Sequence, residues 1–344
     1  MSDQVLDVLP QTPAGKRAAW VWQRVLAIAA GTAVPHRREL DEQYRQEWLD
    51  EVPMDESFAR MASLAKVMRD VHGEPAAADE VRLVIDLSDG TARRFRCVVE
   101  QAPPHRIVFQ VFSPAMPTAS SVDRVIERDR VIERDGRNVH VRDFGGDGPL
   151  LLLWHGAGVD ATIWEAVVPY LRSCRVVAQD LPGHGRSLIS HLSIADTIAD
   201  GDAVVTDLGL GEPILAGFSL GGWAALHYAA TRSCRALVCL DGPTNLDYAA
   251  MGLRPSHPGF VPDPPDVPAD FASLRCPAIV VLCGGESPDD AQWMVPFRAG
   301  LAEYLTAVLA DIRVTWLETG HMLVLSKAKE TAALINEFAA AQNG

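Results

Sequence analysis

The segment Gly217-Phe218-Ser219-Leu220-Gly221 separates two parts of the chain that have different secondary-structure preferences. Residues 213–216 have the apolar composition of a buried strand, and residues 222–230 are rich in helix-forming types. The pattern therefore predicts a strand, a sharp turn and a helix. A turn this tight leaves no room for side chains at its flanks, so glycine is expected there and the Ser219 hydroxyl is expected to point outward as a nucleophile. The helix that begins beside Ser219 directs its positive dipole end toward any negative charge formed on a bound carbonyl.

A second glycine-rich turn follows an earlier apolar run. Residues 150–154 are Leu-Leu-Leu-Leu-Trp, which is typical of a strand buried on both faces, and His155-Gly156-Ala157-Gly158 comes directly after them. Such a turn lets a backbone N–H, here that of Ala157, approach a substrate oxygen. The N–H of Leu220, directly after the serine, is the expected second donor of this oxyanion hole.

A histidine near the C-terminus has the position expected of a general base. Residues 314–317 predict a strand, Gly320-His321-Met322 follow it, and a helix is expected from about residue 326 to residue 341. With an acid between them, the chain order is serine, acid, histidine. This order distinguishes the arrangement from other convergent triads.

From residue 122 to residue 344 the sequence resembles the α/β-hydrolase family. Besides the motifs above, Asp180-Leu181-Pro182-Gly183-His184-Gly185-Arg186-Ser187 matches the D-x-P-G-x-G-x-S loop of that family. The resemblance implies an α/β fold with a doubly wound, mostly parallel eight-stranded sheet. It also implies a serine hydrolase with a Ser-Asp-His triad, and we expect neither a cofactor nor a bound metal.

The acid of the triad is left open by the sequence. Family members commonly carry an aspartate three residues after the glycine that closes a late strand, but after Gly285 that position holds Pro288, with Asp289 and Asp290 next. The competitor is Asp241, at the end of the preceding predicted strand, where some haloalkane dehalogenase relatives carry their acid. We favour Asp241, because a carboxylate at a strand end is held more tightly than one in a Pro-Asp-Asp loop.

Apolar residues close to the motifs indicate the kind of substrate. Phe218 adjoins Ser219, and Trp164 and Met322 are expected nearby, so we predict an apolar substrate pocket, although ordinary core packing would use the same residue types. The expected reaction is hydrolysis of an ester, lactone or thioester of a small to medium apolar metabolite through an acyl-enzyme. Alternatives on the same triad are a C–C bond hydrolase, a non-hydrolytic acyltransferase or cyclase, and a catalytically weak receptor-like protein.

Composition and charge argue against several other classes of protein. The 344 residues are 48% hydrophobic and 22% charged, with a formal net charge of −14. This acidic balance argues against nucleic acid and anionic membrane as partners, because both attract cationic surfaces. The sequence shows neither a secretion signal nor a membrane span, and its six scattered cysteines lack a Cys-x-x-Cys spacing. We therefore expect a cytoplasmic protein with buried, reduced thiols.

A separate α+β domain is expected over residues 1–112. Three helices are predicted, from Thr12 to Gly31, from about Glu39 to Asp50 and from about residue 55 to Gly73, and three alternating strands follow them. The pattern weakly resembles ketosteroid-isomerase-like and cystatin-like folds. Besides a small-molecule substrate, the partner that the sequence leaves open is a second copy of the chain, bound through this domain.

Three further segments complete the prediction. Residues 113–121, rich in proline and small polar residues, indicate a linker between the domains at 1–112 and 122–344. Residues 124–129 are repeated as 130–135, and Asp135-Gly136 predicts a hairpin at the edge of the large sheet.

The segment between Asp241 and residue 278 is where members of this family commonly insert a helical cap over the site. Eight prolines in this segment argue against a packed helical cap, so we expect the cap to be reduced. Our hypothesis is that the N-terminal domain covers the site as a lid, and the alternative is a domain tethered for stability or dimerisation.

Overall fold

The chain divides into two compact units, Met1–Thr118 and Ala119–Gly344, in a computed structural model. The boundary falls within the segment predicted as a linker. The residues that the structure describes are 4–32, 35–46, 49, 54–74, 76, 78–88, 92–114, 128–157, 159–187, 193–209, 211–242, 274–285, 295–308 and 311–341. The two units are taken separately below.

The N-terminal unit packs helices against an antiparallel sheet. Its longest helix begins after Thr12, whose Oγ1 accepts a hydrogen bond from the Gly15 N–H at 3.1 Å, with Pro13 at the first helical position. The apolar face of this helix buries Val21, Trp22 and Val25 in one core with strand residues such as Phe95. The elements are α1 (Gln4–Asp7), α2 (Pro13–Ala29), α3 (Arg37–Gln43), α5 (Met54–Ala65), β1 (Met68–Glu74), β2 (Glu80–Leu87), β3 (Ala92–Val99) and β4 (Ile107–Pro114).

Two of the predicted helices are shorter than expected. The second ends with α3, because Tyr44 adopts extended backbone and forms a bridge with Ile107. The third ends with α5, and β1 begins within the span assigned to it. Strand pairing with β2 prevails over helix propensity here, since β1 buries Met68 and Val71 in the core of the unit. The sheet therefore has four strands in the order β1-β2-β3-β4 rather than three.

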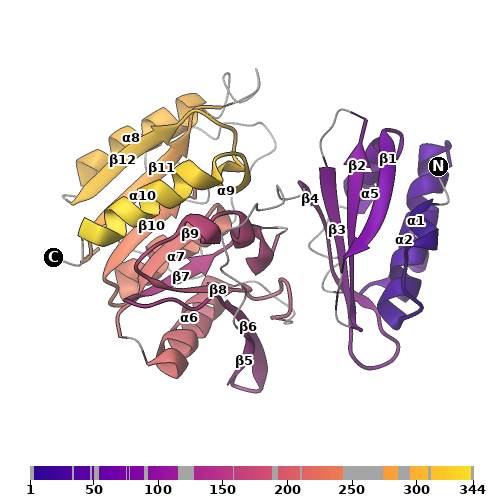
Figure 1. The fold of residues 1–344 in the computed structure, drawn as a ribbon, viewed down its shortest axis with the longest axis horizontal. Coiled ribbons are helices and arrows are strands. Elements are labelled where there is room, and N and C mark those ends of the chain that lie inside the picture. The colour runs from indigo at the N-terminus through magenta and orange to yellow at the C-terminus, as the bar shows by residue number, and fades with distance from the viewer. Residues whose placement is uncertain are drawn as a thin grey trace. The chain divides into compact units, whose positions relative to one another are not determined.

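The second unit is built around one large sheet (Figure 1). Its strands are β5 (Arg128–Arg134), β6 (Arg137–Asp143), β7 (Leu150–Trp154), β8 (Arg175–Gln179), β9 (Ile214–Phe218), β10 (Ala236–Leu240), β11 (Ala278–Cys283) and β12 (Ile312–Leu317). Their order across the sheet is β12-β11-β10-β9-β7-β8-β6-β5. The strands from β12 to β8 are parallel, whereas β6 and β5 run antiparallel at one edge. This confirms the predicted doubly wound, mostly parallel eight-stranded sheet.

Helices cover both faces of this sheet, which explains the uninterrupted apolar strands. Along β7, Leu150, Leu152 and Trp154 enter one buried cluster, and Leu151 and Leu153 enter the other. The first cluster is covered by α6 (Ile194–Leu208), α7 (Leu220–Thr231) and α8 (Val295–Val308). The second is covered by η1 (Ala161–Ala166), η2 (Val168–Tyr170), α9 (Leu323–Ser326) and α10 (Ala328–Ala341).

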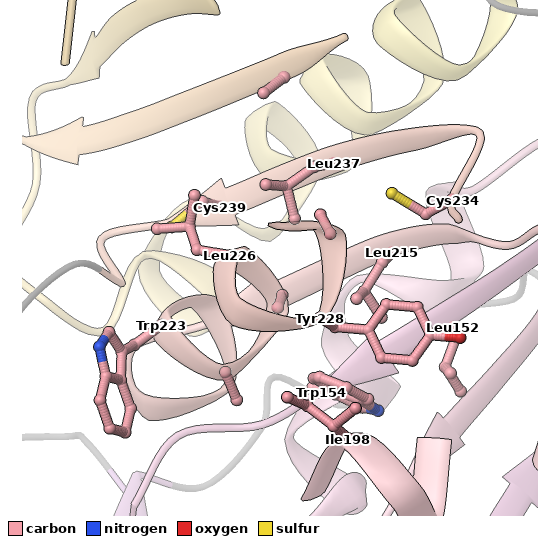
Figure 2. Close-up of a cluster of buried hydrophobic side chains, with 14 of the residues drawn as sticks. Leu152, Trp154, Ile198, Leu215, Trp223, Leu226, Tyr228, Cys234, Leu237 and Cys239 are labelled. Carbon is pink, nitrogen blue, oxygen red and sulfur yellow. The ribbon is translucent and has the colours of Figure 1, made fainter. Parts of the chain in front are cut away.

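Close packing of α7 on the sheet fixes the position of the turn that precedes this helix. Figure 2 shows Leu226 of α7 against Leu237 and Cys239 of β10, and the ring of Trp154 beside that of Tyr228. The two rings meet edge to face, with centroids 5.6 Å apart. Each fully buried apolar side chain stabilises the fold by roughly 1.5–3 kcal/mol, so α7 has a well-defined place on the strands beneath it.

The predicted edge hairpin is present as β5 and β6. Asp135 and Gly136 have φ angles of +51° and +75°, the two positive values that a two-residue type I′ turn requires. Residues 124–127 of the repeat lie outside the described residues. None of the helices in the described part of the chain combines the length and the apolar character needed to cross a membrane.

Candidate active site

Ser219 lies in a strained turn between β9 and α7. Its φ and ψ angles are +52° and −120°, an unusual conformation for a residue with a side chain. A Cβ at Gly217 would lie 2.1 Å from the Gly221 carbonyl oxygen, and a Cβ at Gly221 would lie 2.4 Å from that of Trp154. Both flanking glycines are therefore required by close backbone approach. The sharp turn predicted from the sequence is present, and Ser219 is partly exposed at its apex.

A chain of hydrogen bonds connects Ser219 to His321 and Asp241. Ser219 Oγ lies 2.9 Å from His321 Nε2, and His321 Nδ1 lies 2.6 Å from Asp241 Oδ2. The histidine side chain is 40% exposed, whereas that of the aspartate is 2% exposed. This geometry suits proton transfer from a hydroxyl to an imidazole that is oriented by a buried carboxylate.

The end of β10 positions both the serine and the aspartate. The Ser219 N–H donates to the Leu240 carbonyl at 2.9 Å, and the Asp241 N–H donates to the Val281 carbonyl at 2.7 Å. Asp241 has a φ of +48°, and its Oδ1 also accepts the Cys283 N–H at 3.2 Å. The structure thus brings Asp241, the favoured candidate, against His321. The alternatives Asp289 and Asp290 lie outside the described residues.

Arg298 is a residue of the site that sequence reasoning missed. From the first turn of α8, its Nε donates to Asp241 Oδ1 at 2.7 Å and its Nη2 donates to Oδ2 at 2.5 Å. Burial alone would raise the pKa of Asp241, but the His321 hydrogen bond and the Arg298 charge outweigh burial and hold this pKa below its usual value. In the sequence, the one feature that could have drawn attention to Arg298 is that it is a lone arginine near the start of the largely apolar segment that forms α8.

The other predicted residues lie at different depths around Ser219. Leu220 is the first residue of α7, where backbone N–H groups have no partner within the helix, and Ala157 lies in an exposed turn after β7. The Phe218 ring is buried, with its centroid 5.0 Å from that of the His321 ring. Met322 is partly buried against the same cluster as Trp164, which is fully buried. The oxyanion-hole and substrate-binding roles of these residues stay predictions.

Within the described ranges, no three histidine, cysteine or carboxylate side chains are grouped in a way that could hold a metal ion. The six cysteines are all buried, and the sulfur atoms of Cys234 and Cys276 lie 2.9 Å apart.

Several known proteins with sequences similar to part of this chain carry the names of ester-cleaving enzymes. Residues 151–266 match the sequence model of the alpha/beta hydrolase family. The chain is 33% identical to the pimeloyl-(acyl-carrier protein) methyl ester esterase of Vibrio campbellii, 34% to lipase LipV of Mycobacterium tuberculosis and 36% to protein phosphatase methylesterase 1 of Mus musculus. These matches cover 35%, 32% and 34% of this chain and 47%, 44% and 33% of the relatives. The chain thus spans less than half the length of each of these relatives.

Among solved structures, carboxylesterase CesB from Bacillus subtilis has the same architecture. The similarity has a TM-score of 0.52 at 17% identity and covers 64% of this chain and 94% of CesB. At this identity the likeness concerns the fold alone. The fold of the second unit is that of the alpha/beta hydrolases.

Proposed function

We propose that this protein is a serine hydrolase that cleaves an ester, lactone or thioester of a small to medium apolar compound. The observation that carries the proposal is the continuous hydrogen-bonded chain from Ser219 Oγ through His321 to Asp241, with the serine partly exposed at the apex of a strained turn. The printed names of the relatives, which include an esterase, a lipase and a methylesterase, support ester hydrolysis as the reaction class.

In the proposed mechanism, Ser219 Oγ attacks the substrate carbonyl carbon while His321 Nε2 takes the hydroxyl proton. Backbone N–H groups of Leu220 and Ala157 stabilise the oxyanion of the tetrahedral intermediate. The bond to the leaving group then breaks, and His321 returns the proton to that group. Water repeats the sequence on the acyl-enzyme, releasing the acid and restoring Ser219. Asp241 orients the imidazole and stabilises its charged form throughout.

The apolar surroundings of the serine support an apolar acyl or alcohol group in the substrate. The Phe218 ring lies close to the His321 ring at a tilted angle, and Met322 follows that histidine in sequence and packs on the neighbouring core. Side chains of this kind bind neutral carbon chains and rings better than charged groups, because burial of a charge without a partner is costly. We therefore propose that Phe218, Met322 and Trp164, which share one apolar cluster, shape the substrate pocket.

Labelling with a fluorophosphonate probe tests this function, because only an activated serine reacts well. The full chain should label and hydrolyse short-chain p-nitrophenyl esters, and Ser219→Ala should lose both activities while keeping its circular dichroism spectrum. Ser63→Ala is the matched control, since Ser63 is an exposed serine in the N-terminal unit. Absence of labelling in the parent protein would contradict the proposal and favour a receptor-like role.

Product analysis separates hydrolysis from the alternatives on the same triad. With an added alcohol as competing nucleophile, a hydrolase yields mainly the free acid, whereas an acyltransferase yields mainly the new ester. Cleavage of a 1,3-dicarbonyl compound in preference to every ester tested would instead identify a C–C bond hydrolase.

A further inference from the structure

The carboxylate of Asp241 is held by three separate elements. Its Oδ2 accepts from His321 Nδ1 and from Arg298 Nη2, and its Oδ1 accepts from Arg298 Nε and from the Cys283 backbone N–H. The arginine and aspartate side chains are 3% and 2% exposed. A cation and an anion are thus buried together directly behind the histidine, and the mechanism proposed above has not used the cation.

On the basis of the proposed function, we propose that Arg298 is a positioning residue of the active site. Its guanidinium fixes the plane of the Asp241 carboxylate toward His321 and offsets the carboxylate charge, so that the His321–Asp241 pair takes up a proton only at a lower pH. The serine consequently has an unprotonated base over a wider pH range.

Geometry supports the positioning role. A guanidinium that donates two parallel hydrogen bonds to a carboxylate restricts rotation of that carboxylate, which a single ammonium group cannot do. Arg298 is itself held in place, because its neighbours Phe297 and Leu301 in α8 are buried in the core beneath the helix. The orientation of Asp241 is therefore coupled to the packing of α8 on the sheet.

The charges around Asp241 support the second part of the proposal. Among the described residues, the titratable groups placed against this carboxylate are Arg298 from α8, His321 from the loop before α9, and Cys239 from β10. Burial raises the pKa of the Cys239 thiol to about 12, so the thiol stays neutral. The Glu318 carboxylate, directly after β12, lies beside Gly284, the residue that follows β11, and adds a negative charge nearby.

Removal of Arg298 should shift proton uptake by the pair in one direction only. Whether the added proton resides on the imidazole or on the carboxylate, loss of an adjacent cation makes the protonated pair more favourable. The acid limb of the pH–rate profile should therefore move to higher pH. A charge at this distance commonly shifts titration by about 1–3 pH units, and we expect a shift of at least about one unit.

The test compares Arg298→Gln, Arg298→Lys and a control, Arg142→Gln, by the pH dependence of Ser219 labelling and of p-nitrophenyl ester hydrolysis. For Arg298→Gln we expect the shifted acid limb and a kcat lower by about 10- to 100-fold, with KM changed much less. Arg298→Lys keeps the positive charge but loses the two parallel hydrogen bonds to the carboxylate. The acid limb of its pH–rate profile should therefore stay near that of the parent, while kcat falls about tenfold.

Arg142→Gln controls for the loss of a buried ion pair in general. Arg142 lies on β6, far across the sheet from β10, and its Nη1 is 2.6 Å from Glu165 Oε1 with only 6% of the side chain exposed. The pH profile of this variant should match that of the parent. A purely structural role for Arg298 would make Arg298→Gln resemble this control, which would overturn the proposal.

A second readout does not depend on turnover. In a Ser219→Ala background, NMR titration of the His321 ring follows proton uptake with and without Arg298→Gln, and equal midpoints would overturn the proposal.

The outcomes also separate this proposal from the proposed function. Absence of labelling in the parent would refute the serine hydrolase function, whereas the NMR measurement would still test Arg298. If Arg298→Gln does not fold, Arg298→Lys decides: a reduced kcat with an unshifted acid limb supports the proposal, and parental kcat overturns it.

Discussion

At the residue scale, the turn around Ser219 depends on glycines that are needed for space. We expect Gly221→Ala to destabilise the second unit by about 3 kcal/mol and to abolish labelling, because its Cβ would lie 2.4 Å from one backbone carbonyl oxygen and 2.5 Å from the next. Gly209→Ala is the matched control. Gly209 has a φ of +62° but nothing near its added Cβ, so the cost should be about 1 kcal/mol in urea unfolding. Equal effects of the two substitutions would contradict the steric explanation.

Also at the residue scale, the identity of the acid can be tested directly. Asp241→Asn should lower kcat by about 10⁴-fold, because the amide NH2 can donate to His321 Nδ1 and so favour the wrong imidazole tautomer. The neutral amide also leaves Arg298 buried without its anion. The rate of the parallel variant Asp289→Asn should fall far less. A larger loss in Asp289→Asn than in Asp241→Asn would instead place the acid in the later loop.

At the element scale, the N-terminal sheet contains a buried charge cluster that should control its stability in acid. Glu80 Oε1 on β2 accepts hydrogen bonds from Arg96 Nε on β3 at 2.5 Å and from Arg82 Nε on its own strand at 2.5 Å. Burial alone would raise the pKa of Glu80, but these two arginines outweigh burial and lower it from 4.5 to about 2. Because the folded-state pKa is the lower one, the cluster stabilises the fold above about pH 4.5, and this contribution is lost as the pH falls toward 2.

Glu80→Gln tests this cluster. At neutral pH the variant should be about 3 kcal/mol less stable than the parent, and its stability should vary less with pH between about 4.5 and 2. Urea unfolding as a function of pH measures both effects. Glu39→Gln is the control, because Glu39 and Arg24 form a pair whose side chains are 40% and 44% exposed, and its loss should change the stability by less than about 1 kcal/mol.

At the scale of the whole molecule, the chain holds two units with separate cores. One core lies between α2, α5 and the small sheet, and the others lie on the two faces of the large sheet. We expect calorimetry to resolve two transitions, with Glu80→Gln lowering one of them and Gly221→Ala the other. A single transition lowered by both variants would show that the units unfold as one cooperative body.

Two proposals from the sequence concern the whole molecule: that the N-terminal domain covers the site as a lid, and that copies of the chain associate through this domain. Sedimentation measurements over a range of protein concentrations test whether copies associate. If the N-terminal domain covers the site, substitution of residues on its surface should alter the labelling rate of bulky probes more than that of small ones. Equal effects on both kinds of probe would favour a domain tethered for stability or dimerisation.

The local features of this protein can be predicted from its amino-acid sequence. The glycine-flanked turn at Ser219, the two-sided burial of strands such as β7, and the Asp135-Gly136 hairpin each depend on residues within a few positions of one another. Local sterics and periodicity are sufficient for such features, because the interacting groups are neighbours in the chain. The class of fold follows from their order.

Contacts between side chains that are distant in the sequence become visible only in the folded protein. Asp241 and His321 are 80 positions apart, and Asp241 and Arg298 are 57 apart, so the sequence offers Asp241 only as one of several candidates. The lone arginine of α8 is visible in the sequence, but nothing there connects it with Asp241. Likewise, β1 formed where a helix was expected, because pairing with β2 outweighs local propensity. Contacts across such separations depend on how β10, β11 and α8 pack, and no local pattern encodes that packing.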